Sequence, residues 1–176
     1  AIKESLTIPA NAPKVDLDWS SYAGKKRVLP WYILSTLLMA DTGIRIFMHG
    51  ASGHTAGPIY TKNVLPDLGI PVATTMDEAI EQLENNNFAY MDLEHLSSKI
   101  HELIEMRPLL GLRSPVHTIA RMLNPFDAEH VMQGIFHPGY QPTHQEAGVI
   151  LGFPHMAVIK GEGGEIERNP DLKLTI

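Results

Sequence analysis

The sequence predicts an α/β domain with a mainly parallel sheet and helices on both of its faces. Three observations lead to this fold class. Short runs rich in β-branched and aromatic residues alternate with longer segments of helical pattern, and parallel strands need such crossover connections. Proline and glycine separate many of these segments. The composition is that of an ordinary globular chain, with 44% hydrophobic and 19% charged residues.

Length and composition exclude several classes of protein. A chain of 176 residues is long enough for one domain with a sizeable core and short for two. It contains no cysteine, which excludes a disulfide framework, a thiolate nucleophile and a cysteine-based zinc site. The net charge of −6 gives no general reason to expect nucleic acid or an anionic membrane as a partner, although a local basic patch remains compatible with it.

No segment has the character of a membrane span or a secretory leader. The longest apolar stretch, Ile33 to Ala40, is interrupted by Ser35 and Thr36 and is far too short to cross a bilayer. The first residues, AIKESLTIPANAPK, mix charges and prolines instead of forming an apolar core. We therefore expect no membrane partner and a cytoplasmic protein.

The first elements follow from period and punctuation. Val15 to Trp19 alternates as a short strand. Pro30 suits a first helical position, and Trp31 to Ala40 is apolar nearly all round, which predicts a helix buried between layers. Asp41-Thr42-Gly43 ends that helix, and Ile44 to Met48 is the second strand.

The alternation continues to the end of the chain. A capping box is expected at Thr75 and Glu78, where the hydroxyl takes one free amide and the carboxylate reaches back to another. The expected elements are a helix from Pro58 to Pro66 or Gly69, a helix from Met76 to about Asn85, a strand from Phe88 to Met91, a helix from about Glu94 to Met106, a helix from Ser114-Pro115 to before Asn124, a strand from Val131 to Phe136, a helix from Thr143 to Leu151 and a strand from His155 to Lys160.

The loop after the second strand is the first candidate site. It lies in the stretch IFMHGASGHTAGP, residues 46–58, at the carboxyl end of a parallel strand, where ligands of such sheets bind. Glycines let backbone amides approach a ligand, and a helix N-terminus favours anions. The hydroxyls of Ser52 and Thr55 and the rings of His49 and His54 add possible contacts to phosphate or base. A turn that needs glycine for geometry alone explains the pattern equally well.

Two further segments carry cations. Lys25, Lys26 and Arg27 follow the first strand and could clamp phosphates, although such a run is more often a solvated loop. Arg113 precedes a capped helix, where its charge opposes the helix dipole and favours recognition of a carboxylate or phosphate. His117 lies one turn into that helix. Pairing of Arg113 with a neighbouring acid and packing of His117 in the core remain open.

Metal binding has a weak signal. Glu165 and Glu167, in the segment GEGGEIE of residues 161–167, could hold magnesium through their carboxylates, but a glycine turn with solvated acids is the commoner structure. The nine histidines show no His-x3-His spacing: His95 and His101 are six apart, and His130 and His137 are seven apart. The sequence therefore predicts no histidine metal site.

Taken in order, these segments resemble the anthranilate phosphoribosyltransferase family, which shares its fold with the pyrimidine nucleoside phosphorylases. The resemblance covers Val15 to about Glu167. It rests on His49-Gly50, a helix ending in Leu68-Gly69, the R-x-x-L-G-[IL]-R segment of Arg107 to Arg113, Asn124-Pro125 and the A-V-x-x-G strand of Ala157 to Gly161. Residues 53–57, GHTAG, are also similar to the phosphorylase G-H-T-G-G stretch.

The resemblance implies a fold and a domain organisation. The fold is the catalytic domain of the nucleoside phosphorylase and phosphoribosyltransferase type. Family members are a good deal longer and carry a helical domain that contributes to dimerisation. We therefore expect residues 1–176 to be a single α/β domain, the central part of a longer chain without its helical domain, and a homodimer for the full-length protein.

The chain departs from the family where catalysis is expected. The family's G-T-G-G-D-type phosphate loop reads WSSYAGKKR here, residues 19–27, with one glycine and no following aspartate. The lysine before H-G is Met48, and the paired Asp-Glu magnesium ligands fall near Ile166 and Glu167. Phosphoribosyl transfer needs a diphosphate cradle and magnesium to stabilise the leaving group. The arginine that contacts anthranilate in the family is kept as Arg107.

The segment GLRSPVHT, residues 111–118, resembles an anthranilate-phosphoribosyltransferase-like subgroup that lacks the catalytic signature and is linked to nucleic-acid binding without sequence preference. This resemblance implies a degenerate site whose basic cleft binds a nucleic-acid backbone. The candidate phosphate- and nucleic-acid-binding residues are Ser21, Lys25, Lys26, Arg27, His49, Gly50, Ser52, His54, Thr55, Arg107, Arg113 and His117.

Two other functions remain open beside nucleic-acid binding. One is a working glycosyl or phosphoribosyl transferase that uses phosphoribosyl diphosphate and magnesium, the only cofactor expected, with His49 or His54 substituting for the missing groups. The other is a nucleoside phosphorylase, which the missing glycine-aspartate loop disfavours. The net charge of −6 counts against nucleic-acid binding, because domains with that function usually carry an excess of cations.

Overall fold

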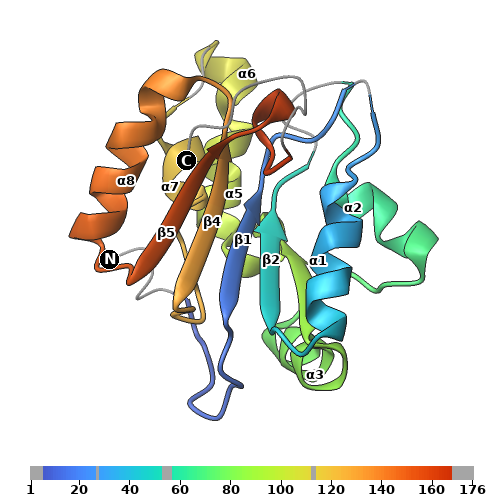
Figure 1. The fold of residues 1–176 in the computed structure, drawn as a ribbon. Helices are drawn as coiled ribbons and strands as arrows, with labels where there is room; N and C mark the ends of the chain where they lie inside the picture. Colours follow the sequence, from blue (N-terminus) through green and yellow to red (C-terminus); the bar gives the residue numbers. More distant parts are fainter. Residues whose placement is uncertain (1–5, 27, 53–56, 112–113, 168–176) are drawn as a thin grey trace.

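A five-stranded, fully parallel sheet forms the centre of the computed structural model, which describes residues 6–26, 28–52, 57–111 and 114–167. The strand order is β3-β2-β1-β4-β5 (Figure 1). The strands are β1 (Leu17–Ser21), β2 (Ile46–Gly50), β3 (Phe88–Asp92), β4 (His130–Ile135) and β5 (His155–Lys160). The expected fold class is confirmed, and the helices connect consecutive strands as a parallel sheet requires.

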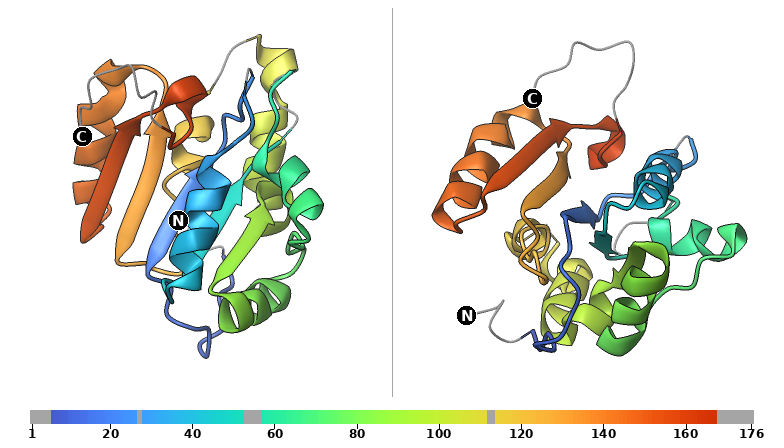
Figure 2. Two further views of the ribbon diagram at one scale, coloured as in Figure 1. Left: turned by 45° about the vertical axis from the view of Figure 1, so that its right-hand side comes forward. Right: turned by 60° about the horizontal axis from the view of Figure 1, so that its bottom comes forward.

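Helices fill the connections on both faces of the sheet. Figure 2 shows α8 beside β5 at one edge and α3 beside β3 at the other. The helices are α1 (Tyr32–Asp41), α2 (Thr61–Val64), α3 (Met76–Asn86), α4 (Leu93–Leu96), α5 (Ser98–Glu105), α6 (Arg107–Leu110), α7 (Val116–Ala120) and α8 (Gln141–Ile150), with the 3-10 turns η2 (Pro66–Leu68), η3 (Pro138–Tyr140) and η4 (Glu162–Gly164).

The core has two layers, one on each face of the sheet. In β2 the side chains alternate between them: Ile46 and Met48 pack with α1, whereas Phe47 packs with the layer that contains α3, α5 and α7. All five residues of β1, β2 and β3 are buried. Strands buried on both faces are the mark of a parallel sheet between helical layers.

The helix expected from Glu94 to Met106 is two helices. α4 ends at Leu96 and α5 begins at Ser98, because Ser97 is extended, with φ −155° and ψ 90°. Serine is a weak former of helix interiors and suits such a break. The change of direction buries Leu96 at the end of the first helix and Ile100 in the second.

The helix expected from Pro58 begins only at Thr61. The residues before it are extended, and Ile59 forms an antiparallel bridge with Lys25, with N–H to O distances of 2.8 and 2.7 Å in the two directions. This bridge holds the loop after β1 against the segment that follows the glycine loop. The first helical turn is replaced by this pairing.

The expectation that α1 is buried on all sides is wrong. Tyr32, Ile33, Thr36 and Ala40 are buried, but Leu38 on the opposite face is 67% exposed. Nothing in the described ranges covers that face of the helix. No helix among the described residues is long and apolar enough to cross a membrane.

Candidate functional site

The strand order places the candidate site at the carboxyl ends of β1 and β4. From β1 the chain winds outward through β2 and β3, then returns to build β4 and β5 on the other side. In sheets of this kind a crevice opens where the order reverses, and ligands bind there. Figure 1 shows that η4 lies over this edge, above the end of β1. The loops after β1 and β5 therefore meet at the expected ligand position.

Glu165 lies inside this meeting point. Its Oε1 accepts hydrogen bonds from the backbone N–H of Ala23 at 2.5 Å and of Gly24 at 2.8 Å. Gly24 has a φ of +65°, which turns two successive amides toward one acceptor. Gly161 permits the close fold of the loop, since a Cβ there would lie 1.5 Å from the Glu165 carbonyl oxygen. Two amides of the phosphate-loop position thus bind a carboxylate of the chain itself.

The carboxyl group of Glu165 is fully buried. Burial raises its pKa, against the lowering effects of the Arg121 charge and of the Ala23 and Gly24 amides. The protonated form is thereby favoured relative to an exposed glutamate. A buried carboxyl group that already accepts hydrogen bonds from two backbone amides is a poor ligand for a hydrated cation.

Glu167 occupies a second anion position. Its Oε1 lies 2.8 Å from Lys25 Nζ, and its Oε2 accepts a hydrogen bond from the Tyr32 N–H at 3.2 Å. Tyr32 is the first residue of α1, where the helix dipole favours negative charge. Glu162 also approaches Lys25 Nζ, at 3.5 Å. The N-terminus of α1 and the nearest lysine are both satisfied internally.

Of the three expected cations, the structure describes Lys25 and Lys26 and places them in different environments. Lys25 is 1% exposed and paired with two glutamates, so the expectation of a solvated loop is wrong for it. Its burial depends on carboxylates that lie far along the sequence, which local pattern does not reveal. Lys26 is exposed. Arg27 lies outside the described residues.

His49 and Gly50 are the last two residues of β2, next to β1. His49 is fully buried, with Nδ1 2.7 Å from the Tyr22 hydroxyl and Nε2 3.3 Å from Asp18 Oδ2. Burial raises the pKa of Tyr22, and the Asp18 charge adds to this, so the hydroxyl keeps its proton. At Gly50 a Cβ would lie 2.0 Å from the Ser21 carbonyl oxygen. This pair positions the end of β2 against β1.

Three hydroxyl groups meet beneath the loop after β1. Ser21 Oγ lies 2.7 Å from Thr61 Oγ1 and 3.1 Å from the Tyr32 hydroxyl, and Tyr32 and Thr61 are 2.9 Å apart. All three residues are buried. Ser21, a predicted site residue, therefore links β1, α1 and α2.

A second polar group lies at the ends of β2 and β3. It contains Ser52, which was predicted, and Lys62, Asp92 and Glu94, which were missed from sequence. Lys62 Nζ lies 3.3 Å from Asp92 Oδ2 and 2.7 Å from Glu94 Oε1. Ser52 Oγ donates to Asp92 at 3.3 Å. Burial lowers the pKa of Lys62, but the Glu94 hydrogen bond and the Asp92 charge outweigh it and raise the pKa overall. Asp92 is the last residue of β3 and directly follows the strand expected from sequence, Phe88 to Met91, and that position was the available signal.

Two further predicted residues, Arg107 and His117, lie in α6 and α7. Arg107 is half-buried at the start of α6, and His117 Nδ1 lies 3.2 Å from the Ser114 carbonyl oxygen. Arg121, which the sequence did not single out, donates to the carbonyl oxygens of Gly134 at 2.6 Å and Gly164 at 3.2 Å. It ties the end of β4 to η4. His54, Thr55 and Arg113 lie outside the described residues.

Glu165 and Glu167 do not fit magnesium. Magnesium needs carboxylate oxygens with room for several waters. Glu165 is buried against amides, and a cation at Glu167 would compete with the ammonium group of Lys25. Ile166, at the position implied for the partner carboxylate, offers no ligand.

Comparisons with known proteins find relatives and solved structures, several of which are named anthranilate phosphoribosyltransferase. No family model matches the chain. An uncharacterised protein of Aquifex aeolicus is 29% identical over 175 residues, which cover 97% of this chain and 51% of that protein. Anthranilate phosphoribosyltransferases of Polynucleobacter necessarius and Caldivirga maquilingensis are 26% and 24% identical, over 71% and 93% of this chain and 36% and 48% of theirs. The chain spans about half or less of the length of these relatives.

Solved structures show the same fold. Anthranilate phosphoribosyltransferase from Thermus thermophilus has a TM-score of 0.73 at 21% identity, covering 94% of this chain and 50% of that one. The Saccharomyces cerevisiae enzyme in complex with PRPP and Mg has a TM-score of 0.75 at 13% identity, covering 93% and 46%. The chain is thus similar in sequence to anthranilate phosphoribosyltransferases, and the similarity in structure shows that it shares their fold.

Proposed function

We propose, from this kinship with the anthranilate phosphoribosyltransferases, that the chain is part of a protein with a degenerate catalytic site that binds nucleic acid without sequence preference. One observation carries the proposal: the chain's own Glu165 and Glu167 occupy the anion positions at the carboxyl end of β1. A free diphosphate would have to displace both carboxylates. This arrangement supports loss of the transferase reaction rather than a variant of it.

Occupation of these positions by Glu165 and Glu167 is energetically favoured over occupation by a free anion. Backbone amides at a turn and at a helix N-terminus are general anion sites. A carboxylate attached to the same chain has a high effective concentration, so it competes strongly with a diffusing ligand. Lys25 neutralises Glu167 in the same place. We propose that Lys25, His49, Gly50 and Ser21 maintain the shape of this edge and leave the contacts with phosphate to other residues.

We propose that nucleic acid contacts side chains around the amides that Glu165 and Glu167 occupy. Lys26 is exposed, and Arg107 and Ser52 are half-buried. The proposal also includes candidates in the ranges 27, 53–56 and 112–113, namely Arg27, His54, Thr55 and Arg113. Cations spaced around one edge bind a polymer through several weak phosphate contacts, which makes affinity strongly dependent on salt.

Oligonucleotide titration tests the proposal. A fluorescent single-stranded DNA is titrated at several salt concentrations, with PRPP and magnesium added as competitor. We expect sequence-independent binding that weakens with salt and is unaffected by the competitor. Lys26→Ala with Arg107→Ala should weaken binding and reduce the salt slope by about 0.7 for each phosphate that the protein no longer neutralises. Lys99→Ala, an exposed lysine on α5, is the matched control.

The opposite result supports the enzymatic alternative. If the oligonucleotide does not bind while PRPP binds with magnesium, the chain is part of a working transferase that uses both ligands. Binding of both at independent sites would leave the nucleic-acid proposal standing and overturn the claim of a filled cradle.

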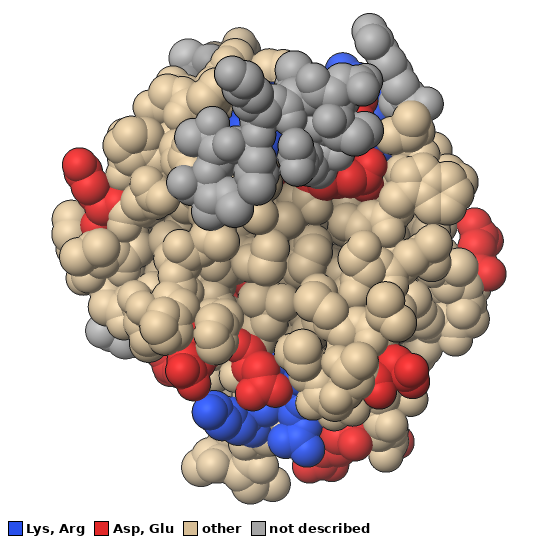
Figure 3. Space-filling view, viewed as in Figure 1, with Lys and Arg blue, Asp and Glu red and all other residues tan. Residues whose placement is uncertain are grey.

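We also propose that the chain is the central part of a longer protein with a helical domain and that this protein is a homodimer. Figure 3 shows a largely uncharged surface between α1 and α8 on the face in view. Leu34 is 50% and Leu38 67% exposed on α1, and Met132 and Ile159 of the sheet are only partly buried. Sedimentation of a longer version of the protein tests the dimer. Slower hydrogen exchange of the α1 amides in the longer version than in this chain tests the added domain.

A further inference from the structure

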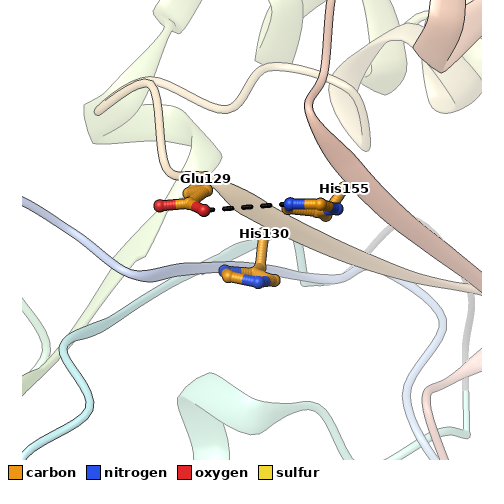
Figure 4. Close-up of side chains that lie close together, drawn as sticks. All are labelled: Glu129, His130 and His155. Atoms are coloured by element: carbon orange, nitrogen blue, oxygen red, sulfur yellow. Dashed lines mark ion pairs between the residues drawn. The ribbon is translucent and has the colours of Figure 1, made fainter.

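A histidine pair lies at the amino ends of the strands, whereas the candidate site lies at their carboxyl ends. His130 begins β4 and His155 begins β5, and the two residues are register partners. Their rings are nearly parallel, with centroids 5.0 Å apart and an interplanar angle of 19°. Glu129 precedes His130, and its Oε1 lies 3.8 Å from His155 Nε2 (Figure 4). One possible ligand atom from each of these residues lies within 4.8 Å of the others.

No local pattern in the sequence indicates this cluster, because its histidines come from different strands. The sequence contains no His-x3-His spacing of the kind that places two ligands on one helix. Parallel pairing of β4 with β5 instead brings residues 130 and 155 side by side at the start of two strands. Among the described residues, Glu129, His130 and His155 are the set of at least three potential metal ligands whose ligand atoms lie close together. It is independent of the loops at the carboxyl edge.

The orientation of His130 suits a metal ligand. Its Nδ1 lies 3.3 Å from the Asp16 carbonyl oxygen, which selects the tautomer that donates a proton from Nδ1 and leaves Nε2 as a lone-pair donor. A carbonyl partner for the second ring nitrogen is the usual support of a histidine ligand. The backbone N–H of His130 also donates to the Asp16 carbonyl, at 3.1 Å.

Exposure and charge leave room for an ion. The side chains of His155 and Glu129 are 61% and 48% exposed, so waters can complete a coordination shell. Glu129 also lies 3.5 Å from Lys14 Nζ, but that pair is solvent-exposed and contributes little. Four-coordinate zinc holds its ligand atoms about 3.3 Å apart at bonds of about 2.0–2.2 Å, so the side chains must close by roughly 1.5 Å. Exposed rotamers can make that adjustment.

We propose that His130, His155 and Glu129 form a binding site for a divalent transition metal, with zinc as the first choice. Two imidazoles and one carboxylate match zinc, copper and nickel, and they do not match magnesium or calcium, which prefer oxygen ligands. Water fills the remaining position. A bound ion would link the starts of β4 and β5 and so stabilise this edge of the sheet.

Metal titration of the untagged protein tests the site. Zinc binding is measured by calorimetry, cobalt binding by its visible absorption, and stability by thermal unfolding. We expect one ion per chain and a rise of the unfolding midpoint by roughly 5–10 °C at about one hundred times the dissociation constant.

Variants decide which residues bind the ion. His130→Ala and His155→Ala should each lower zinc affinity at least about tenfold and abolish the cobalt spectrum, and Glu129→Gln should weaken binding less. His137→Ala is the matched control, since His137 is an exposed histidine beyond the other end of β4. Zinc binding that survives both histidine variants, or no binding at all, overturns the proposal. Circular dichroism of each variant shows that lost binding is not lost folding.

Discussion

At the scale of the residue, the main finding is a carboxyl group that fills a position built for an anion. Glu165 accepts two backbone hydrogen bonds while fully buried. A side-chain carboxyl group stays attached to the chain, so the amides of Ala23 and Gly24 have an acceptor without a ligand. The cost is the burial of an ionisable group, which is reflected in its raised pKa.

This raised pKa makes a prediction about stability and pH. A carboxyl whose pKa is higher in the folded state contributes stability that is present below the ordinary value of 4.5 and is lost as pH rises through the raised value. Glu165→Gln keeps an oxygen acceptor and removes the ionisation. We therefore expect the variant's free energy of unfolding to rise relative to the parent between pH 4.5 and pH 7, as measured by urea unfolding.

The control for this experiment is Glu146→Gln, at an exposed position on α8. Its unfolding free energy should track that of the parent across the same pH range. A constant difference between Glu165→Gln and the parent would mean that Glu165 titrates alike in the folded and unfolded states.

Lys25 supports a second prediction at this scale. Lys25→Met removes a buried ammonium and leaves Glu167 and Glu162 without their cation. Breaking a fully buried pair costs about 3–5 kcal/mol, and partial exposure of the glutamates reduces this, so we expect a loss of about 2 kcal/mol in unfolding free energy.

The double variant Lys25→Met with Glu167→Gln should recover part of this loss, because it leaves no unpaired charge at Glu167. Lys26→Met, next in the chain and exposed, should change stability by no more than about 0.5 kcal/mol. Equal effects at the two lysines in denaturant unfolding would show that the pair with Glu167 adds nothing.

At the scale of the element, α3 shows how far local sequence determines structure. Half of the capping box expected at Thr75 and Glu78 forms: Thr75 Oγ1 accepts from the Glu78 N–H at 3.2 Å. The Glu78 carboxylate reaches back to the Thr74 N–H at 2.8 Å, one residue earlier than expected. Its backbone and side-chain hydrogen bonds with Thr74 lower the pKa of Glu78. The helix begins at Met76 as predicted.

The cap yields a third prediction. Thr75→Ala removes the acceptor for the Glu78 amide and should lower the free energy of unfolding by about 1 kcal/mol. Thr75→Ser keeps the hydroxyl and should retain most of that stability. Thermal and denaturant unfolding measure both. If serine and alanine are equally destabilising, the threonine methyl group rather than the hydrogen bond is responsible.

Other elements could not be placed as well from sequence. The N-terminus of α2 and the break between α4 and α5 depend on contacts with Lys25 and with the core, which no window of neighbouring residues contains. Strand starts were two residues early for β1 and β2, because Asp16 and Arg45 hydrogen-bond just outside the ladder and extend the apparent strand pattern. The order of helices and strands was predictable, because it follows from the spacing of hydrophobic residues and the positions of proline and glycine.

At the scale of the whole molecule, the sequence predicted the fold class and the edge where a site would lie. It could not predict which charges meet there. Glu165 and Glu167 meet the loop of Ala23 to Lys25 because β4 pairs with β1 and β5 pairs with β4, which brings the residues after β5 near the end of β1. The histidine pair of residues 130 and 155 depends on the same pairing. Long-range contacts thus decide both functional proposals.

The central place of β1 also has a consequence for the folding of the chain. β1, β2 and β3 lie within the first 92 residues and pair in sequence, whereas the other side of β1 waits for β4, which begins at His130. During synthesis, β1 therefore presents an unpaired edge until the later part of the chain has been made. Such an edge recruits strands from other chains, so premature termination between β3 and β4 would yield an aggregating product rather than a shorter folded one.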